Sequence, residues 1–126
     1  MQNNDLPYIR NIISHGLIKI GIKCDLVAFN YLCYAIELVI KNPTFSTNLC
    51  ENVYNKVVKA FNLKNVFVVE RNIRNAIDIL ANTKGFSSLN KIFGTELYSP
   101  YEKPTPGELI NLMAEYYRIG LYKKSI

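Results

Sequence analysis

The pattern that most restricts the fold of this chain is a pair of helical segments within residues 56–85, KVVKAFNLKNVFVVERNIRNAIDILANTKG. It predicts a short helix, a tight turn over residues 62–65 and a longer helix over residues 66–84. At about 100° per residue, the longer helix has one apolar and one polar face. The apolar face contains Val66, Val69, Ile73, Ala76, Ile77 and Leu80. The polar face contains Arg71, Asn75, Asp78 and Asn82, with Glu70 and Arg74 at its edges.

The polar face of this helix has two interpretations. Any helix at the surface of a globular protein exposes polar groups, so the face by itself does not imply a ligand. Guanidinium and amide groups on a helix can also read base edges in the major groove of DNA. Under the second interpretation, the two segments form a helix-turn-helix.

Two helices are predicted before this segment. Apolar residues recur at spacings of three and four over residues 6–20, and Gly21 should end that helix. A second helix is expected over residues 26–41, with Asp25 as its N-cap. It is apolar on almost every side, so it should lie at the centre of the core. Asn42 precedes a proline and should end it.

Capping residues place the third and fourth helices. Ser46 or Thr47 is expected to begin the third helix, and Asn65 the fourth. The fourth should close at Lys84 and Gly85, which provide a cation in the last turn and a glycine at the C-cap position.

Two more helices complete the prediction. A short one should begin at Ser87 or Ser88 and end at Gly94. A longer one should run to about residue 120 and be followed by a mobile tail. Its start is marked by a capping box with proline at the first helical position, formed by Thr105, Pro106 and Glu108. No segment shows the alternation of a strand, so we predict one all-α domain of six helices over residues 1–126, in which the third and fourth form a helix-turn-helix.

Charge and hydropathy favour a nucleic-acid partner. The 126 residues include 15 Lys and Arg against 10 Asp and Glu, which gives a net charge of +5 and a pI near 9.1. This modest excess favours an acidic partner, with nucleic acid ahead of an anionic membrane surface. No apolar run reaches the length of a membrane span, and the N-terminus lacks the features of a secretory signal. We therefore expect a cytoplasmic protein with no membrane partner.

The sequence contains no recognisable set of catalytic or metal-binding residues. The cysteines, Cys24, Cys33 and Cys50, form no CxxC pair and should be buried, reduced thiols. His15 has no second ligand at a suitable spacing and should be a surface residue. Acids occur singly, and no Gly-rich phosphate loop is present. We therefore expect neither an enzyme nor a bound cofactor or metal.

A family resemblance sharpens these predictions. Residues 69–78, VERNIRNAID, strongly resemble the recognition-helix motif VERAIRHAIE of the C-terminal effector domain of stage-zero sporulation protein A, a sporulation response regulator. Further segments resemble that domain in the same order, namely the Ile-Gly pair at 20–21, FNYLCYAIELVIKN at 29–42, KAFN at 59–62, Phe-Gly at 93–94 and KPT at 103–105. The resemblance covers about residues 8–121. It implies six helices with a helix-turn-helix, in agreement with the residue pattern.

The resemblance also implies a function. Members bind short promoter boxes in double-stranded DNA, often as two copies on adjacent sites, and contact the sigma factor of RNA polymerase. The residues that match the family's recognition helix, or stand in its positions, are the expected base readers: Glu70, Arg71, Arg74 and Asn75, where the family has His in place of Asn75. The expected phosphate contacts are Lys59, Lys64, Asn65 and Lys84, which would position the protein without reading sequence.

Two departures from the family fall at the start of the longer helix. Val68 stands where the family has a base-contacting arginine, and Phe67 replaces a small polar residue. The turn before them is one residue longer than in the family. Either these apolar side chains contact thymine methyl groups, or this face binds another protein. The second alternative would make the chain an interaction module that modulates a full-length relative or a sigma factor. Since 126 residues leave no room for the family's receiver domain, we expect either a stand-alone paralogue or an excised effector domain, with the first favoured.

Overall fold

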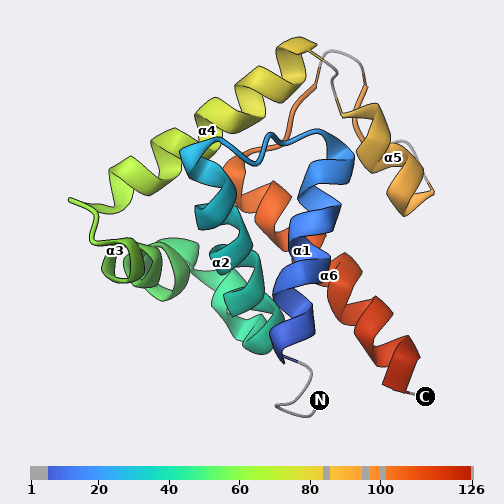
Figure 1. Cartoon of the computed structure of the whole chain (residues 1–126), viewed down its shortest axis with the longest axis horizontal. Coiled ribbons are helices and arrows are strands. Elements are labelled where there is room, and N and C mark those ends of the chain that lie inside the picture. The colour runs from blue at the N-terminus through green and yellow to red at the C-terminus, as the bar shows by residue number, and fades with distance from the viewer. Residues whose placement is uncertain (1–5, 84–85, 95–96, 100–101, 126) are drawn as a thin grey trace.

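The computed structural model describes residues 6–83, 86–94, 97–99 and 102–125 (Figure 1). The six α-helices are α1 Leu6–Ile20, α2 Val27–Lys41, α3 Asn55–Phe61, α4 Val66–Thr83, α5 Ser87–Phe93 and α6 Pro106–Ser125. A 3₁₀-helix, η2 Pro43–Thr47, and a π-helical turn, η3 Cys50–Tyr54, connect α2 to α3. The described residues contain no strand, so the prediction of an all-α fold with six helices is confirmed.

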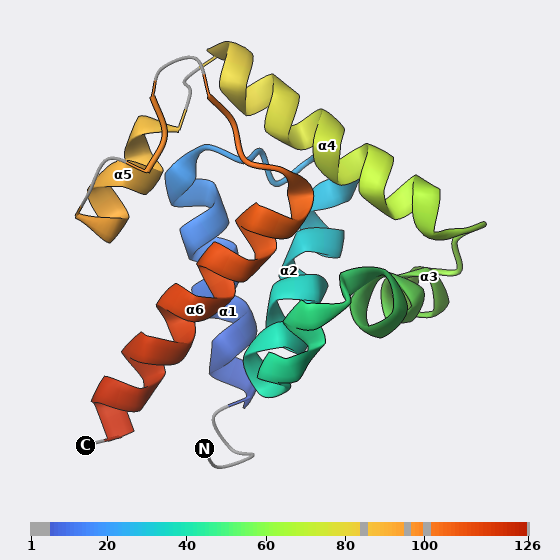
Figure 2. The same ribbon diagram turned by 180° about the vertical axis from the view of Figure 1, so that it is seen from behind.

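Helix α2 lies at the centre of the molecule. It packs against α1, α4 and α6, and ten of its fifteen residues are buried. Figures 1 and 2 show α1, α2 and α6 side by side, with α4 crossing their ends. Helix α3 lies at one end of α4 and α5 towards the other. The central position predicted for the second helix is confirmed, because a helix without a polar face needs partners on several sides.

Several predicted helix ends are observed. Helix α1 ends before Gly21, whose φ of 109° is readily adopted only by glycine. Helix α5 ends before Gly94, which is in the left-handed region at φ 70°. The capping box of α6 is formed in both directions. Thr105 N–H donates to Glu108 Oε1 at 3.0 Å, and Glu108 N–H donates to Thr105 Oγ1 at 3.1 Å.

The predicted caps of the second and third helices are wrong. Leu26 occupies the N-cap position of α2 without a side-chain hydrogen bond, so Asp25 does not cap it. The hydroxyls of Ser46 and Thr47 donate to backbone carbonyls three residues earlier, within η2, at 2.9 Å each. Asn48 caps the helical turn η3 that leads into α3, since its Oδ1 accepts a hydrogen bond from the N–H of Glu51 at 3.2 Å.

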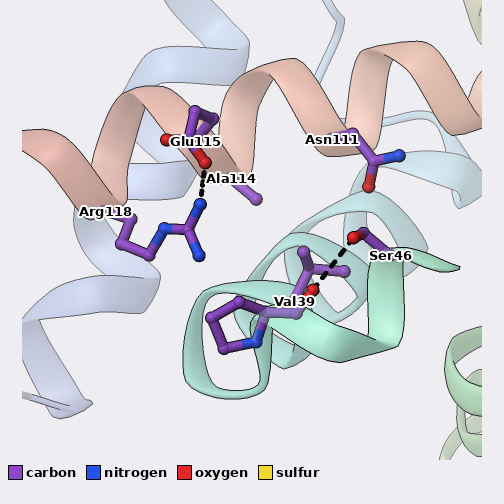
Figure 3. Close-up of a pocket in the computed structure, with 7 residues that line it drawn as sticks. Val39, Ser46, Asn111, Ala114, Glu115 and Arg118 are labelled. Carbon is purple, nitrogen blue, oxygen red and sulfur yellow. Dashed lines mark hydrogen bonds and ion pairs between the residues drawn. The ribbon is translucent and has the colours of Figure 1, made fainter.

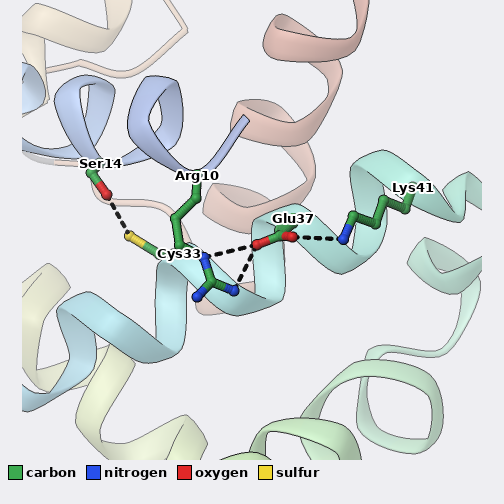
Figure 4. Close-up of polar contacts among 5 residues, drawn as sticks. All are labelled: Arg10, Ser14, Cys33, Glu37 and Lys41. Carbon is green, nitrogen blue, oxygen red and sulfur yellow. Dashed lines mark hydrogen bonds and ion pairs between the residues drawn. The ribbon is translucent and has the colours of Figure 1, made fainter. Parts of the chain in front are cut away.

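The C-terminal helix and the cysteines also differ from the prediction. Helix α6 continues to Ser125 through Gly120, because a glycine lowers helix propensity by about 1 kcal/mol but keeps its backbone N–H. Cys33 is buried as expected, 3.5 Å from Ser14 Oγ (Figure 4), and burial raises the pKa of its thiol. Cys24 and Cys50 are free and exposed, so the expectation of buried thiols is wrong for these two.

A buried carboxylate joins α1 to α2. Glu37 is only 9% exposed, and two cations surround its carboxylate (Figure 4). Arg10 donates to Oε1 from Nε at 3.0 Å and from Nη2 at 2.8 Å, while Lys41 donates to Oε2 at 2.6 Å. The Lys41 contact follows from the i, i+4 spacing. The Arg10 contact spans 27 residues and has no local signal.

Replacing this carboxylate should give a pH-dependent loss of stability. Burial raises the pKa of Glu37, but hydrogen bonds from Lys41 and Arg10 outweigh it, so the folded-state pKa lies below the ordinary 4.5. A lowered folded-state pKa stabilises the fold above 4.5, and that contribution disappears as pH falls through the folded value. Glu37→Gln should cost about 1–2 kcal/mol at neutral pH, because both cations keep solvent contact. Urea unfolding of the two proteins should show this difference shrinking in acid, and a constant difference would contradict the assignment.

Candidate nucleic-acid interface

The turn between α3 and α4 is held by its own asparagines. Asn62 adopts the left-handed conformation, φ 54°, at the C-cap of α3, which asparagine does more easily than most residues. Asn65 Oδ1 accepts the N–H of Val68 at 3.2 Å and caps α4. The predicted N-cap of the fourth helix is therefore confirmed. Lys84 and Gly85, its predicted end, lie outside the described residues, and α4 is described to Thr83.

Helix α3 is anchored by an aromatic side chain just before this turn. The ring of Phe61 lies edge-on to Tyr31 and Tyr34 of α2, with centroids 5.0 and 6.0 Å apart. Such edge-to-face pairs add about 0.5–1.5 kcal/mol to the burial of their area. The turn and the first residues of α4 are thus fixed relative to α2.

One face of α4 is buried and the opposite face is open. The buried side chains are Val69, Ile73, Ala76, Ile77 and Leu80. Val66 is half-buried and packs against the same core. The apolar face predicted from helical spacing is confirmed. Figures 1 and 2 show α4 at the periphery, with its length crossing the α1, α2 and α6 layer.

The side chains predicted to read bases lie along the open face. Arg71, Arg74 and Asn75 are exposed, and the side chain of Glu70 is 46% exposed. They fall within two successive helical turns, so α4 brings them together without help from another element. All four lie within the first ten residues of α4.

Both acidic residues of α4 form ion pairs. Glu70 Oε1 lies 3.0 Å from Arg74 Nη2, and Asp78 Oδ1 lies 2.5 Å from Lys103 Nζ. The second pair spans 25 residues and has no signal in the local sequence. Arg71 has no ion pair among the described residues. The one uncompensated charge on α4 is therefore the guanidinium of Arg71.

A buried tyrosine lies close to the Glu70 carboxylate. Tyr54, from η3, is 5% exposed. Burial, and then the negative charge of Glu70, raise the pKa of Tyr54 to about 12, so its hydroxyl stays neutral. Because η3 packs against α4, Tyr54 forms part of the surface on which this helix rests.

The predicted phosphate contacts have different surroundings. Lys59 and Lys64 are exposed on the last turn of α3 and in the turn that follows. Asn65 is exposed, but its Oδ1 is used in capping α4. Lys84 lies outside the described residues. Two of the four residues thus present exposed ammonium groups near the start of α4.

The two apolar residues that differ from the family motif at the start of α4, Phe67 and Val68, are exposed to different degrees. Phe67 is 75% exposed, whereas Val68 is half-buried. At about 100° per residue, Phe67 lies about 40° from Arg71 around the helix, and Val68 lies further towards the other edge. Only Phe67 projects fully from the open face.

One hollow lies away from α4. This hollow of about 130 Å³ lies between the end of α2, η2 and α6 (Figure 3), and it is lined by Val39, Pro43, Ser46, Asn111, Ala114, Glu115 and Arg118. Cofactor and drug-sized ligands occupy pockets of about 300–1,000 Å³, so this hollow is too small for one. The described residues contain no group of three His, Cys, Asp or Glu side chains able to bind a metal. None of the described helices has the length and apolarity needed to cross a membrane.

A comparison with known protein families identifies a family model that matches most of the chain. The model of the family described as "Sporulation initiation factor Spo0A C terminal" matches residues 13–117. The match includes α2, α3, α4 and α5 completely, together with the last eight residues of α1 and the first twelve of α6. The proteins of this family are DNA-binding effector domains and not enzymes.

Proposed function

The chain belongs to the Spo0A C-terminal family of DNA-binding effector domains, and we propose that it is a sequence-specific regulator of transcription. In this proposal α3 and α4 act as a helix-turn-helix, and α4 enters the major groove of promoter DNA. One observation carries the proposal. Helix α4 buries most of its apolar face and leaves Arg71, Arg74 and Asn75 on its open face.

Each polar side chain of that face has a suitable base partner. Arginine donates in bidentate fashion to guanine O6 and N7, which makes Arg71 the leading base reader. Arg74 is a second, and its ion pair with Glu70 restricts the directions that its guanidinium can take. Glu70 can also accept from the cytosine amino group, and Asn75 can pair with adenine N6 and N7.

Sequence-independent contacts come from the start of the same helix. Lys59, Lys64 and Asn65 flank it and would bind phosphates, with Lys84 as a further contact at the other end. We also propose, from the family resemblance, that two copies bind adjacent promoter boxes and that the sigma factor of RNA polymerase is a partner.

Removing a phosphate contact should weaken binding to every duplex alike. Lys64→Ala should lower affinity for specific and unrelated duplexes by the same factor and reduce the salt slope of log K by about one. Fluorescence anisotropy at several salt concentrations measures both quantities. Lys91→Ala is the matched control, since it removes the same charge from the exposed surface of α5. A change confined to one DNA sequence would contradict the phosphate assignment.

The proposal itself is tested by titrating labelled promoter duplexes with the protein. The expected result is saturable binding that weakens steeply as salt increases, with a preference for some duplexes over others of the same length. Absence of binding to any duplex at low salt would overturn it.

A protein-interaction module is the second candidate function. The observation that favours it is the 75% exposure of Phe67 on the face assigned to DNA. If that face binds a protein, Phe67→Ser/Val68→Ser should abolish capture of the full-length relative or the sigma factor without changing DNA affinity. Unchanged capture would exclude this candidate.

A further inference from the structure

Among the large apolar side chains of the described residues, Phe67 is the most exposed, at 75%, followed by Tyr8 at 69%. Leaving a phenylalanine in water forgoes much of the stabilisation that its burial would give. The described structure shows no ring contact for it, in contrast to Phe61, which packs on two tyrosines. Folding therefore does not account for the position of Phe67.

The side chains next to Phe67 on α4 are charged rather than apolar, and the acidic one among them, Glu70, is paired with Arg74. On the open face of α4, Arg71 follows Phe67 by four residues and Arg74 by seven, so both lie within about 40° of it around the helix. Val66 and Val69 turn towards the core, and Val68 is half-buried. Docking surfaces for proteins are mostly contiguous apolar patches rather than a single exposed side chain, so these surroundings favour DNA over the protein partner of the second candidate function. A lone ring one helical turn before Arg71, the uncompensated guanidinium of α4, suits an anionic partner with an isolated apolar group.

Duplex DNA has that chemistry in its major groove. The 5-methyl group of thymine is the apolar contact available there, and phenylalanine is among the side chains that contact it. Residues four apart on a helix have Cβ atoms about 5–6 Å apart, and base pairs rise about 3.4 Å. A ring at position 67 would therefore reach a base pair one or two steps from the one read by Arg71.

We propose that Phe67 is a specificity residue that selects thymine through its 5-methyl group, next to the base pair read by Arg71. This inference rests on the proposed function, in which α4 enters the major groove. The promoter box should then contain a thymine at a fixed distance from the guanine that Arg71 reads. The thymine methyl group would be the ligand of the exposed Phe67 ring.

Replacing thymine by uracil tests the proposal directly, because deoxyuridine lacks only the methyl group. The probe is the duplex that the wild-type protein enriches most from a random pool, with each thymine replaced singly by deoxyuridine. At one position, wild-type affinity should fall about fourfold, the effect of losing one buried methyl group. Phe67→Ala should bind the thymine and uracil forms of that position equally, and Phe67→Leu should keep part of the difference.

The control variant is Tyr8→Ala, which removes an exposed aromatic ring from α1 and should keep the wild-type response to uracil. Circular dichroism should show that Phe67→Ala unfolds at the wild-type temperature, since this side chain is exposed. If no thymine position distinguishes wild type from Phe67→Ala, the proposal is overturned while DNA binding by the wild type still stands. Absence of any enriched duplex would instead overturn the proposed function, and this inference with it.

Discussion

Arg71→Ala is expected to reduce affinity for the specific duplex by about 5- to 150-fold, the discrimination provided by one bidentate arginine–guanine contact. Affinity for unrelated duplexes of the same length should change much less, because phosphate contacts supply most non-specific binding. The effect should exceed that of Arg74→Ala. Arg71 is exposed without an ion pair among the described residues, whereas Arg74 would have to exchange Glu70 for DNA.

Anisotropy titrations against the specific and a scrambled duplex measure this effect. The matched control is Arg118→Ala on α6, whose guanidinium pairs with Glu115 and lies outside the α4 surface. An equal loss on both duplexes would make Arg71 a phosphate contact rather than a base reader. No loss on either would mean that α4 does not enter the groove.

Gly16→Ala is expected to destabilise the fold by about 1–3 kcal/mol, the usual cost of overpacking a core. Gly16 lies where α1 meets the side chain of Tyr117. A Cβ added to Gly16 would overlap the tyrosine hydroxyl and lie 2.7 Å from its Cζ. Tyr117 is only 7% exposed and its ring packs on Tyr116, so it has little room to move aside. The cost should therefore exceed the gain in helix propensity of alanine over glycine, about 1 kcal/mol.

Two further variants make this prediction specific. Gly120→Ala changes the same residue type in α6, where an added Cβ meets nothing within 4 Å, and it should stabilise the protein slightly. Tyr117→Phe removes the overlapping hydroxyl, so the double variant should lose less than the sum of the two single changes. Chemical denaturation gives the free energies of unfolding of the wild type, the three single variants and Gly16→Ala/Tyr117→Phe. Equal effects of Gly16→Ala and Gly120→Ala would contradict the contact between α1 and α6.

Features that depend on neighbouring residues were predictable from the sequence. Apolar spacing gave the bounds of α1, and Asn65 and the Thr105–Glu108 pair marked the starts of α4 and α6. The capping hydrogen bonds of α4 and α6 each join residues three positions apart. The same spacing gave the buried face of α4, because a helix fixes the direction of every side chain relative to its neighbours.

Features that depend on competition or on distant residues were not predictable. Ser46 and Thr47 are good capping residues, but their hydroxyls bond to carbonyls within η2, and Asn48 caps η3. The contacts of Arg10 with Glu37 and of Lys103 with Asp78 join segments 27 and 25 residues apart. Only the packing of helices brings these groups together.

In the candidate site too, local features could be predicted from the sequence and contacts between distant residues could not. Helical spacing placed Glu70, Arg71, Arg74 and Asn75 near one another on the surface. It did not show that Lys103 pairs with Asp78. With Glu70 paired to Arg74, this contact leaves Arg71 as the one uncompensated charge on α4 in the described structure. Helical spacing also grouped Phe67 with Val68, whereas the structure exposes the first and half-buries the second.

The most direct test of sequence-specific binding by α4 is selection of bound duplexes from a random pool by the wild-type protein. The proposed function predicts enrichment of one recurring box that contains a guanine, and the role inferred for Phe67 adds a thymine one or two base pairs away. Recovery of duplexes without a shared box, or of none at all, would contradict it.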